Sequence, residues 1–343
     1  MSEKPTYPGL TETMAALAKQ HHLDEEHADY LTQIFKSVYG LAGDNPDLLT
    51  IKIINSALKE LRYASRVFAR YRDRRKVSVF GSARTKSGDP NYLLAEEFSR
   101  KISEKGYMVI TGAGPGIMEA GHKGAGADNI FGVGIRLPFE QASNPYIEGD
   151  PKMIHFKYFF TRKLMFVKES HALVCFPGGF GTHDEMCETL TLVQTGKSPT
   201  LPIVLLDAPG GGYWKSWDEY VRKHMLEKGM ISEVDLSLYR LTDKVETAVE
   251  EVCRFYRNYH SQRFVGDLLV LRCRQVPKKA PLKQLDQKFV GLLSGGGFAS
   301  SPALPEEADE PELRGLPRIL FKFNRRNFGG LRQLIDEING WDG

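Results

Sequence analysis

The sequence predicts an α/β fold built on a doubly wound parallel sheet, with N-terminal helices before it and a small C-terminal α+β appendage after it. Two observations carry this prediction. Short apolar runs alternate with helical patterns from residue 77 to residue 260, and three of these runs end in loops that contain glycine. The chain has 343 residues, 41% hydrophobic and 26% charged, which is enough for one large α/β domain with additions.

The first part of the chain, residues 8 to 73, is predicted to be helical with a break around Gly40 to Pro46. The helix from Leu48 to Tyr71 carries apolar residues at helical spacing, which is typical of a packing face. The basic residues near its end are Arg62, Arg66, Arg70, Arg72, Arg74, Arg75 and Lys76. A solvated face is the default explanation, but like charges at i,i+4 destabilise a helix, so an anionic partner is the alternative.

Strands and helices are predicted in alternation across the middle of the chain. The strands are expected near 77–80, 107–111, 130–135, 171–176, 202–206 and 238–241. The helices are expected near 91–105, 116–125, 158–168, 182–195, 213–228 and 243–260. Ligands bind at the carboxyl ends of the strands in such a sheet, so the loops at those ends are the place to look for a site.

Three of these loops contain glycine. Gly81-Ser82-Ala83-Arg84 follows the first strand, and Thr111-Gly112-Ala113-Gly114-Pro115-Gly116 follows the second. The third, Pro177-Gly178-Gly179-Phe180-Gly181-Thr182-His183-Asp184-Glu185, leads from an apolar run into a helix. Glycine lets the backbone approach a ligand, and free N–H groups at a helix start attract anions, so the pattern predicts a phosphate site. Ordinary βα turns are the alternative.

Thr182 and Glu185 have capping-box spacing, so Thr182 is expected to cap the helix that follows. A carboxylate beside a phosphate repels it. Glu185 therefore serves either that capping box or chemistry on a group attached to the phosphate.

Taken together, the motifs PGGFGTHDE (177–185), TGAGPGIMEA (111–120) and Arg162-Lys163-Leu164-Met165 resemble the LOG family of nucleoside-monophosphate phosphoribohydrolases, over about residues 75 to 260. Many microbial members were long mislabelled lysine decarboxylases. The resemblance implies a Rossmann-like nucleotide-binding domain that hydrolyses AMP or a cytokinin-type nucleotide to free base and ribose 5-phosphate. It makes Arg162 and Glu185 the catalytic pair. The residues expected to bind the nucleotide and its phosphate are Ser82, Gly112, Gly114, Gly116, Lys163, Gly178, Gly179, Gly181 and Thr182.

The two expected catalytic residues suit this reaction. Positive charge develops on the ribose as the base departs, so a carboxylate such as Glu185 stabilises that charge or activates water. The planar fork of Arg162 holds phosphate or ribose oxygens and orients Glu185, and the scheme needs no cofactor or metal. Arg162 follows the aromatic cluster of residues 155–160, so a side chain that only covers a packed helix is the alternative.

A second class of function stays open. The related molybdenum-cofactor carriers use the same fold to bind a phosphorylated pterin without catalysis. The presence of both Arg162 and Glu185 favours the enzyme, because a carrier does not need that pair. His183 lies within reach of a phosphate, but a catalytic role is not expected for it. The segment from Leu137 to Tyr146 is a candidate wall for the base pocket.

Beyond residue 262 the sequence changes character. Leu268–Arg272 and Ile319–Phe323 are predicted strands, each followed by a helical pattern, with an acidic Gly-, Ser- and Pro-rich connection from residue 295 to 312. We predict a βαβα appendage that holds an effector, shapes access or stabilises an oligomer, with Arg325 and Arg326 the first place to look for an anionic effector. The predicted domains are thus residues 1–74, 75–262 and 263–343.

The remaining observations concern partners and location. A formal net charge of +3 gives no case for nucleic-acid binding, and no apolar run has the length of a membrane span. Four scattered cysteines without a CxxC pair, and no leader peptide, lead us to expect a protein of the reducing cytoplasm. The family resemblance further implies a homo-oligomer.

Overall fold

The computed structural model describes residues 9–136, 142–276 and 281–341, and the chain forms two compact units, Met1–Lys59 and Glu60–Gly343. The boundary falls inside a predicted helix. The proposed division at residues 74 and 262 stays a prediction. Residues 137–141 of the predicted pocket wall lie outside the described residues.

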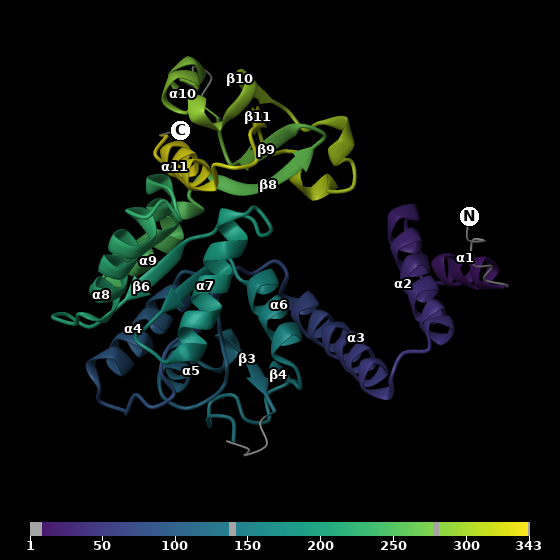
Figure 1. Ribbon diagram of the computed structural model, residues 1–343, viewed down its shortest axis with the longest axis horizontal. Helices are drawn as coiled ribbons and strands as arrows, with labels where there is room; N and C mark the ends of the chain where they lie inside the picture. Colours follow the sequence, from purple (N-terminus) through teal and green to yellow (C-terminus); the bar gives the residue numbers. More distant parts are fainter. Residues whose placement is uncertain (1–8, 137–141, 277–280, 342–343) are drawn as a thin grey trace. The chain divides into compact units, whose positions relative to one another are not determined.

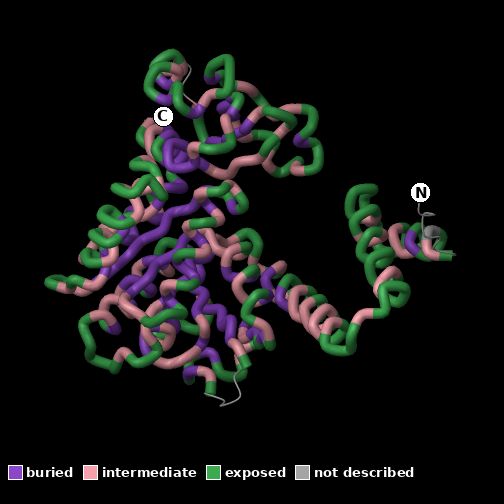
Figure 2. Tube along the Cα trace, in the orientation of Figure 1, coloured by how far each residue is buried: buried purple, intermediate pink, exposed green. Residues whose placement is uncertain are grey.

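The first unit is helical, as predicted. It contains α1 (Leu10–Gln20), α2 (Glu25–Asp44) and the first half of α3 (Leu48–Phe68). The predicted break lies between α2 and α3, and the sequence did not reveal a second break between α1 and α2, where Asp24 accepts a hydrogen bond from the His27 N–H (2.9 Å). Figure 2 shows α2 exposed or half-buried along its length, and no residue of α2 is buried.

The core of the second unit is a seven-stranded sheet in which every paired strand is parallel, with the order β4-β3-β2-β1-β5-β6-β7. Its strands are β1 (Lys76–Phe80), β2 (Met108–Thr111), β3 (Ile130–Ile135), β4 (Met153–Phe156), β5 (Ala172–Cys175), β6 (Ile203–Leu206) and β7 (Tyr239–Thr242). The doubly wound parallel sheet and all six of its predicted strands are confirmed. β4 was missed because Met-Ile-His-Phe is short and follows a Pro-Lys turn.

Helices cover both faces of this sheet (Figure 1). One apolar cluster joins the sheet to α4 (Pro90–Glu104), α5 (Ile117–Ala125) and α9 (Val245–Phe255). A second cluster joins the other face to the end of α3 and to α6 (Phe159–Glu169), α7 (Phe180–Gln194) and α8 (Tyr213–Tyr220). The strands are therefore buried along most of their length (Figure 2), as in parallel sheets generally. None of the helices in the described ranges is long and apolar enough to cross a bilayer.

The chain reverses its direction of travel across the sheet at β1. From β1 it moves outward through β2 and β3 to β4, and it then returns to place β5 on the other side of β1. The loops after β1 and β5 therefore leave neighbouring strands in opposite directions. Such a switch point opens a crevice at the carboxyl ends of the strands, and two of the three glycine loops lie there.

The appendage is a four-stranded antiparallel sheet, not the βαβα unit that was predicted. Its strand order is β10-β11-β9-β8. Its strands and helices are β8 (Tyr259–Val265), β9 (Leu268–Cys273), α10 (Leu282–Lys288), β10 (Leu293–Ser301), β11 (Arg318–Phe323) and α11 (Phe328–Asn339). The two predicted strands are confirmed as β9 and β11. β10 was missed because its sequence, LSGGGFASS, has the composition of a loop, and β11 supplies the pairing that makes it a strand.

The acidic connection after β10 folds back onto two buried arginines. Glu307 lies within 2.7 Å of Arg272 on β9 and 3.1 Å of Arg318 on β11. Glu310 also pairs with Arg272, at 2.5 Å. Carboxylates of the acidic connection are therefore used inside the appendage, where buried arginines require carboxylate partners.

Helix α11 joins the appendage to the core through very close packing. A Cβ on Gly329 would collide with the backbone carbonyl of Val234, which precedes β7. Phe328 lies against Gly196 just after α7, and Arg332 forms an ion pair with the buried Glu251 of α9. The two sheets thus belong to one packed unit.

We predict that Gly329→Ala destabilises the protein, because the added methyl group meets backbone atoms that cannot rotate away. Overpacking of this kind costs about 1 to 3 kcal/mol in the free energy of unfolding, measured by urea titration. The matched control is Gly315→Ala, because a Cβ at Gly315 meets no atom within 4 Å. Equal stability of the two variants would contradict the packing described here.

Candidate functional site

The three glycine loops are joined by the backbone of one residue, Ser82. Its N–H donates to the carbonyl of Pro177 in the third loop (3.0 Å), and its carbonyl accepts from the N–H of Ile117 at the start of α5 (3.1 Å). The loops after β1, β2 and β5 are therefore held together as one surface at the switch point.

The glycines of these loops fall into two groups. A Cβ on Gly116, which has φ of +68°, would collide with the Ser82 carbonyl. A Cβ on Gly178 would collide with the Thr182 side chain and lie 3.0 Å from the carbonyl carbon of Gly81. Gly179 and Gly181, in contrast, are exposed and a Cβ there meets nothing within 4 Å. Packing explains Gly116 and Gly178, whereas Gly179 and Gly181 leave open space at the start of α7.

Helix α7 begins two residues earlier than predicted, and this changes the role of Thr182. The N-cap is Gly179, no side chain caps the helix, and Thr182 lies buried in its first turn. The expectation that Thr182 caps the helix is therefore wrong, because the glycines let the chain enter the helix at Phe180. No hydrogen bond within the described residues involves the N–H groups of Gly179, Phe180 and Gly181.

The second loop is fixed by a buried polar network that the sequence did not reveal. The Thr111 hydroxyl accepts from the Ala113 N–H (3.0 Å) and contacts His122 Nε2 (2.9 Å). Asn144 contacts His122 Nδ1 and donates to the Gly114 carbonyl (3.0 Å). Burial lowers the pKa of His122 to about 4, so the imidazole is neutral at pH 7. The only signal in the sequence is a lone histidine in the helical run after the loop.

Arg162 reaches this second loop from α6. A Cβ on Gly112 would lie 3.1 Å from Nη2 of Arg162, so the guanidinium is beside the backbone of Gly112. The guanidinium also lies over the rings of Phe159 and Phe166, 5.8 and 5.3 Å from their centroids. Its buried Nε has no hydrogen-bond partner. Arg162 and Glu185, the predicted catalytic pair, thus lie beside the second loop and on the helix that follows the third loop.

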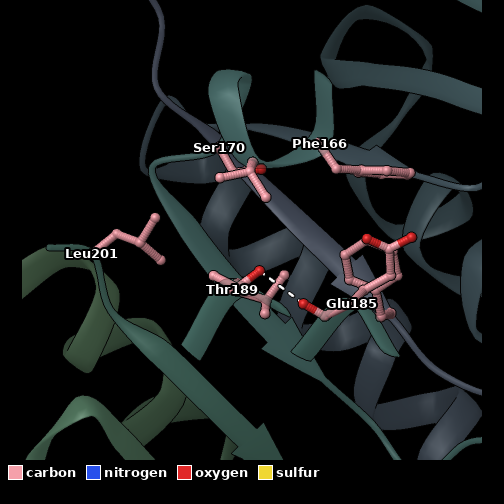
Figure 3. Close-up of a pocket in the computed structure, with 8 residues that line it drawn as sticks. Phe166, Ser170, Glu185, Thr189 and Leu201 are labelled. Atoms are coloured by element: carbon pink, nitrogen blue, oxygen red, sulfur yellow. Dashed lines mark hydrogen bonds between the residues drawn. The ribbon is translucent and has the colours of Figure 1, made fainter. Parts of the chain in front are cut away.

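Glu185 lies in the second turn of α7 and is only 6% exposed. Burial raises its pKa to about 7, although the nearby positive charges of Arg162 and Lys163 lower it in part. Behind it is a cavity of about 10 Å³, around which Figure 3 shows Glu185 with Phe166, Ser170, Thr189 and Leu201. This volume is close to that of a single water probe, so little solvent reaches the carboxylate from that side.

The charges of Arg162 and Glu185 interact through space. Both residues are described, and no direct ion pair joins them, but each favours the charged form of the other. Burial is nevertheless the larger influence on both: it lowers the pKa of Arg162 and raises that of Glu185. The site therefore holds a cation and a poorly solvated carboxyl group that are not directly paired.

Lys163 faces α7, and its ammonium group forms ion pairs with two carboxylates of that helix. Its Nζ lies 2.8 Å from Asp184 and 2.6 Å from Glu188. Burial alone would lower its pKa, but these hydrogen bonds raise it. Lys163 thus joins α6 to α7, and its predicted phosphate contact stays a prediction. Glu119, on α5, accepts a hydrogen bond from the hydroxyl of Tyr92 (3.2 Å).

The basic stretch before β1 has partners within the protein. Arg74 donates to Asn129 (2.7 Å), and Arg75 lies over the ring of Tyr256 at 4.0 Å. The buried ammonium of Lys76 donates to the carbonyls of Tyr71 and Arg74. These contacts explain the last three of the seven basic residues without an external anion.

This arrangement has the chemical features of an anion site beside a titratable carboxyl group. Free N–H groups at the start of α7 attract negative charge, Arg162 adds a fixed cation, and Glu185 titrates near neutral pH. Among the described residues, no group of three or more His, Cys, Asp and Glu side chains has the arrangement of a metal site.

We predict that Glu185→Gln stabilises the folded protein at alkaline pH. The folded pKa of about 7 exceeds the ordinary 4.5, so ionisation of Glu185 costs stability as pH rises from 4.5 through 7. At about 1.4 kcal/mol per pH unit this cost reaches about 3 kcal/mol by pH 8, and is about 1 kcal/mol at pH 5.

Urea unfolding of both proteins at pH 8 and pH 5 tests this prediction. The control Glu188→Gln removes a carboxylate that pairs with Lys163, and it should give no gain at pH 8. A Glu185→Gln protein no more stable than wild type at pH 8 would show that the carboxylate is well solvated.

Comparison with known proteins agrees with the motifs. Residues 116–252 match a family described as "Possible lysine decarboxylase". A pyrimidine/purine nucleotide 5'-monophosphate nucleosidase of Escherichia coli K12 is 29% identical over 141 residues, which are 38% of this chain and only 31% of that protein's length. An uncharacterized protein of Archaeoglobus fulgidus is 28% identical over 132 residues, covering 38% of this chain and 83% of that one.

Solved structures resemble the chain more distantly. The molybdenum cofactor binding protein of Rippkaea orientalis covers 52% of this chain and 94% of its own, with 17% identity and a TM-score of 0.38. This likeness is too low to bear on function. The matched region contains the motifs at residues 162–165 and 177–185, and this similarity supports the resemblance of the chain to the LOG family.

Proposed function

We propose that the protein hydrolyses the N-glycosidic bond of a nucleoside 5'-monophosphate, giving free base and ribose 5-phosphate. The observation that carries this proposal is the buried Glu185, with a pKa near 7, on the helix whose start presents unbonded N–H groups. The Escherichia coli relative is named a pyrimidine/purine nucleotide 5'-monophosphate nucleosidase, which supports the same substrate class. The alignment covers under a third of that protein, so its activity is brought to this chain as a proposal.

The phosphate binds at the start of α7 in this proposal. The N–H groups of Gly179, Phe180 and Gly181 form no hydrogen bond within the described residues, and a Cβ on either glycine would meet no atom within 4 Å. The positive end of the helix dipole and these donors together form an anion site. Binding of the 5'-phosphate there positions the sugar over the next turn of the helix, where Glu185 lies.

The bond to the base breaks as water adds to C1' of the ribose. Positive charge develops on the sugar, and the Glu185 carboxylate stabilises it or removes a proton from the water. The water oxygen becomes the C1' hydroxyl, and the base leaves with the electron pair of the broken bond and a proton. Arg162, fixed by Phe159 and Phe166, supplies a constant positive charge for ribose or phosphate oxygens.

Within this class we propose AMP or a cytokinin-type nucleotide as the substrate, with a role in nucleotide salvage or cytokinin production. The support for this finer choice is the family resemblance. The family resemblance also leads us to propose a cytoplasmic location. The four cysteines form no disulfide, which is compatible with that location.

We predict that purified protein releases free base from at least one nucleoside 5'-monophosphate, and that Glu185→Gln lowers kcat by at least about a hundredfold, as expected for loss of a group acting in the transition state. Arg162→Lys keeps the positive charge but loses the planar guanidinium group, so we expect a smaller decrease in kcat than for Glu185→Gln. Chromatography of a nucleotide panel measures base and ribose 5-phosphate together.

Glu188→Gln is the matched control, because Glu188 lies one turn farther along α7 and pairs with Lys163. It should retain activity within a few-fold. Tight binding of one nucleotide without release of its base would overturn the hydrolase proposal and favour a carrier.

We also propose that a second copy of the chain covers the rim of this site. Phe159, Phe160 and Leu164 of α6 are about half exposed, and Phe180 at the start of α7 is 97% exposed. Lys163 holds these two helices side by side through Asp184 and Glu188. A cluster of large apolar side chains on a surface is typical of a protein interface.

This proposal predicts that Leu164→Glu halves the molar mass found by light scattering, because a charge is costly inside an apolar interface. Leu93→Glu is the control. Leu93 is 53% exposed on α4, against 52% for Leu164 on α6. Identical masses for wild type and both variants would remove this rim from the candidate interfaces.

A further inference from the structure

The glycine loop at the start of α7 is held by a tyrosine from a different part of the chain. The hydroxyl of Tyr213, the first residue of α8, donates to the carbonyl of Gly178. Nε2 of His183, in the first turn of α7, lies 2.6 Å from the same hydroxyl. Trp214, only 1% exposed, packs against the rings of both residues.

The directions of these two hydrogen bonds follow from the available protons. A carbonyl only accepts, so the single proton of the Tyr213 hydroxyl is used by Gly178. His183 must then donate from Nε2 to the phenol oxygen. The chain of donors runs from His183 to Tyr213 to Gly178, and it needs only the Nε2–H tautomer of a neutral imidazole. Burial lowers the pKa of His183, which favours that neutral form.

Tyr213 itself is fixed by the end of β6. Its N–H donates to Oδ2 of Asp207 (3.0 Å), a buried carboxylate at the end of that strand. The other oxygen of Asp207 accepts from the N–H of Ala208 (2.8 Å), which also donates to Asn91 of α4 (2.9 Å). The tyrosine is therefore anchored in the core and does not depend on the glycine loop for its position.

The peptide held by Tyr213 is the one that joins Gly178 to Gly179. Its carbonyl belongs to Gly178 and its N–H to Gly179, one of the unbonded donors at the start of α7. A hydrogen bond to the carbonyl of a peptide polarises the N–H at its other end and makes that N–H a stronger donor. It also fixes the direction in which the N–H points.

We propose that Tyr213, supported by His183, is a positioning residue that aims the Gly179 N–H at a phosphomonoester dianion. The inference rests on the proposed function for the location of the phosphate. It adds to that function a residue outside the glycine motif that sets the affinity for the phosphate end of the substrate.

The test is calorimetric binding of ribose 5-phosphate and of inorganic phosphate to Tyr213→Phe and to wild type. The ring and its packing remain in this variant, and only the hydroxyl is lost. We expect both ligands to bind about tenfold more weakly, as for loss of one hydrogen bond to a peptide group. In turnover, the KM for the nucleotide should rise while kcat changes less. A purely structural role would lower both affinity and kcat together with the melting temperature.

Two sets of controls sharpen this test. Tyr220, the last residue of α8, forms a second tyrosine–histidine ring pair with His224, whose ring centroids are 5.0 Å apart, so Tyr220→Phe should bind both ligands as wild type does. His183→Gln keeps an N–H donor near the position of Nε2 and should bind within about twofold of wild type, whereas His183→Leu removes the donor and should bind more weakly. If Tyr213→Phe does not fold, the two His183 variants still test the hydrogen bonds that run from His183 through Tyr213 to Gly178.

Failure of this inference differs from failure of the proposed function. If wild type binds ribose 5-phosphate and Tyr213→Phe binds it equally well, the positioning role is wrong. If wild type binds neither phosphate ligand, the phosphate site of the proposed function is wrong, and this inference falls with it. A third outcome is that wild type releases no base, but Tyr213→Phe still binds the phosphate ligands more weakly than wild type does. This result would support the positioning role and overturn only the proposal that the protein is a hydrolase.

Discussion

The site depends on the contact of three loops through the backbone of Ser82. Parallel strands bring the loops after β1, β2 and β5 to one edge of the sheet, but topology alone does not fix their spacing. The two backbone hydrogen bonds of Ser82 fix it, and they require glycine at positions 116 and 178 because any side chain there would separate the loops. Those two glycines thus act through packing. Gly179 and Gly181, in contrast, leave open space at the start of α7.

The second constraint is the burial of charge. Glu185 is buried and Arg162 is half-buried, and for each the effect of burial on the pKa outweighs the attraction of the other. Such a pair is poor for stability, since an ionised buried carboxyl group lowers the free energy of unfolding. In the proposed reaction, the positive charge that develops on the ribose would restore to the Glu185 carboxylate the electrostatic stabilisation that it loses through burial.

The sequence indicated the framework well because its signals are local. Apolar runs of four to six residues marked six strands of the parallel sheet, and glycine loops with a following helix marked the ligand edge. What it did not indicate depends on contacts between distant residues. β10 is a strand only because β11 pairs with it, and Tyr213 reaches Gly178 across 35 positions of the chain. Thr182 was misjudged for a local reason, since Gly179 allows the helix to begin earlier than a threonine cap suggests.

Helix α7 is held at both ends by segments that lie outside the glycine motif. At its start, the hydroxyl of Tyr213 donates to the carbonyl of Gly178 and accepts from His183. Just beyond its other end, Phe328 of the appendage fills the space against Gly196, where a Cβ would enter the ring. Gln194 in the last turn donates to Asp235, in the segment on which α11 packs (2.9 Å). The appendage therefore supports the helix that carries the buried Glu185, although it lies at the opposite end of that helix from the unbonded N–H groups.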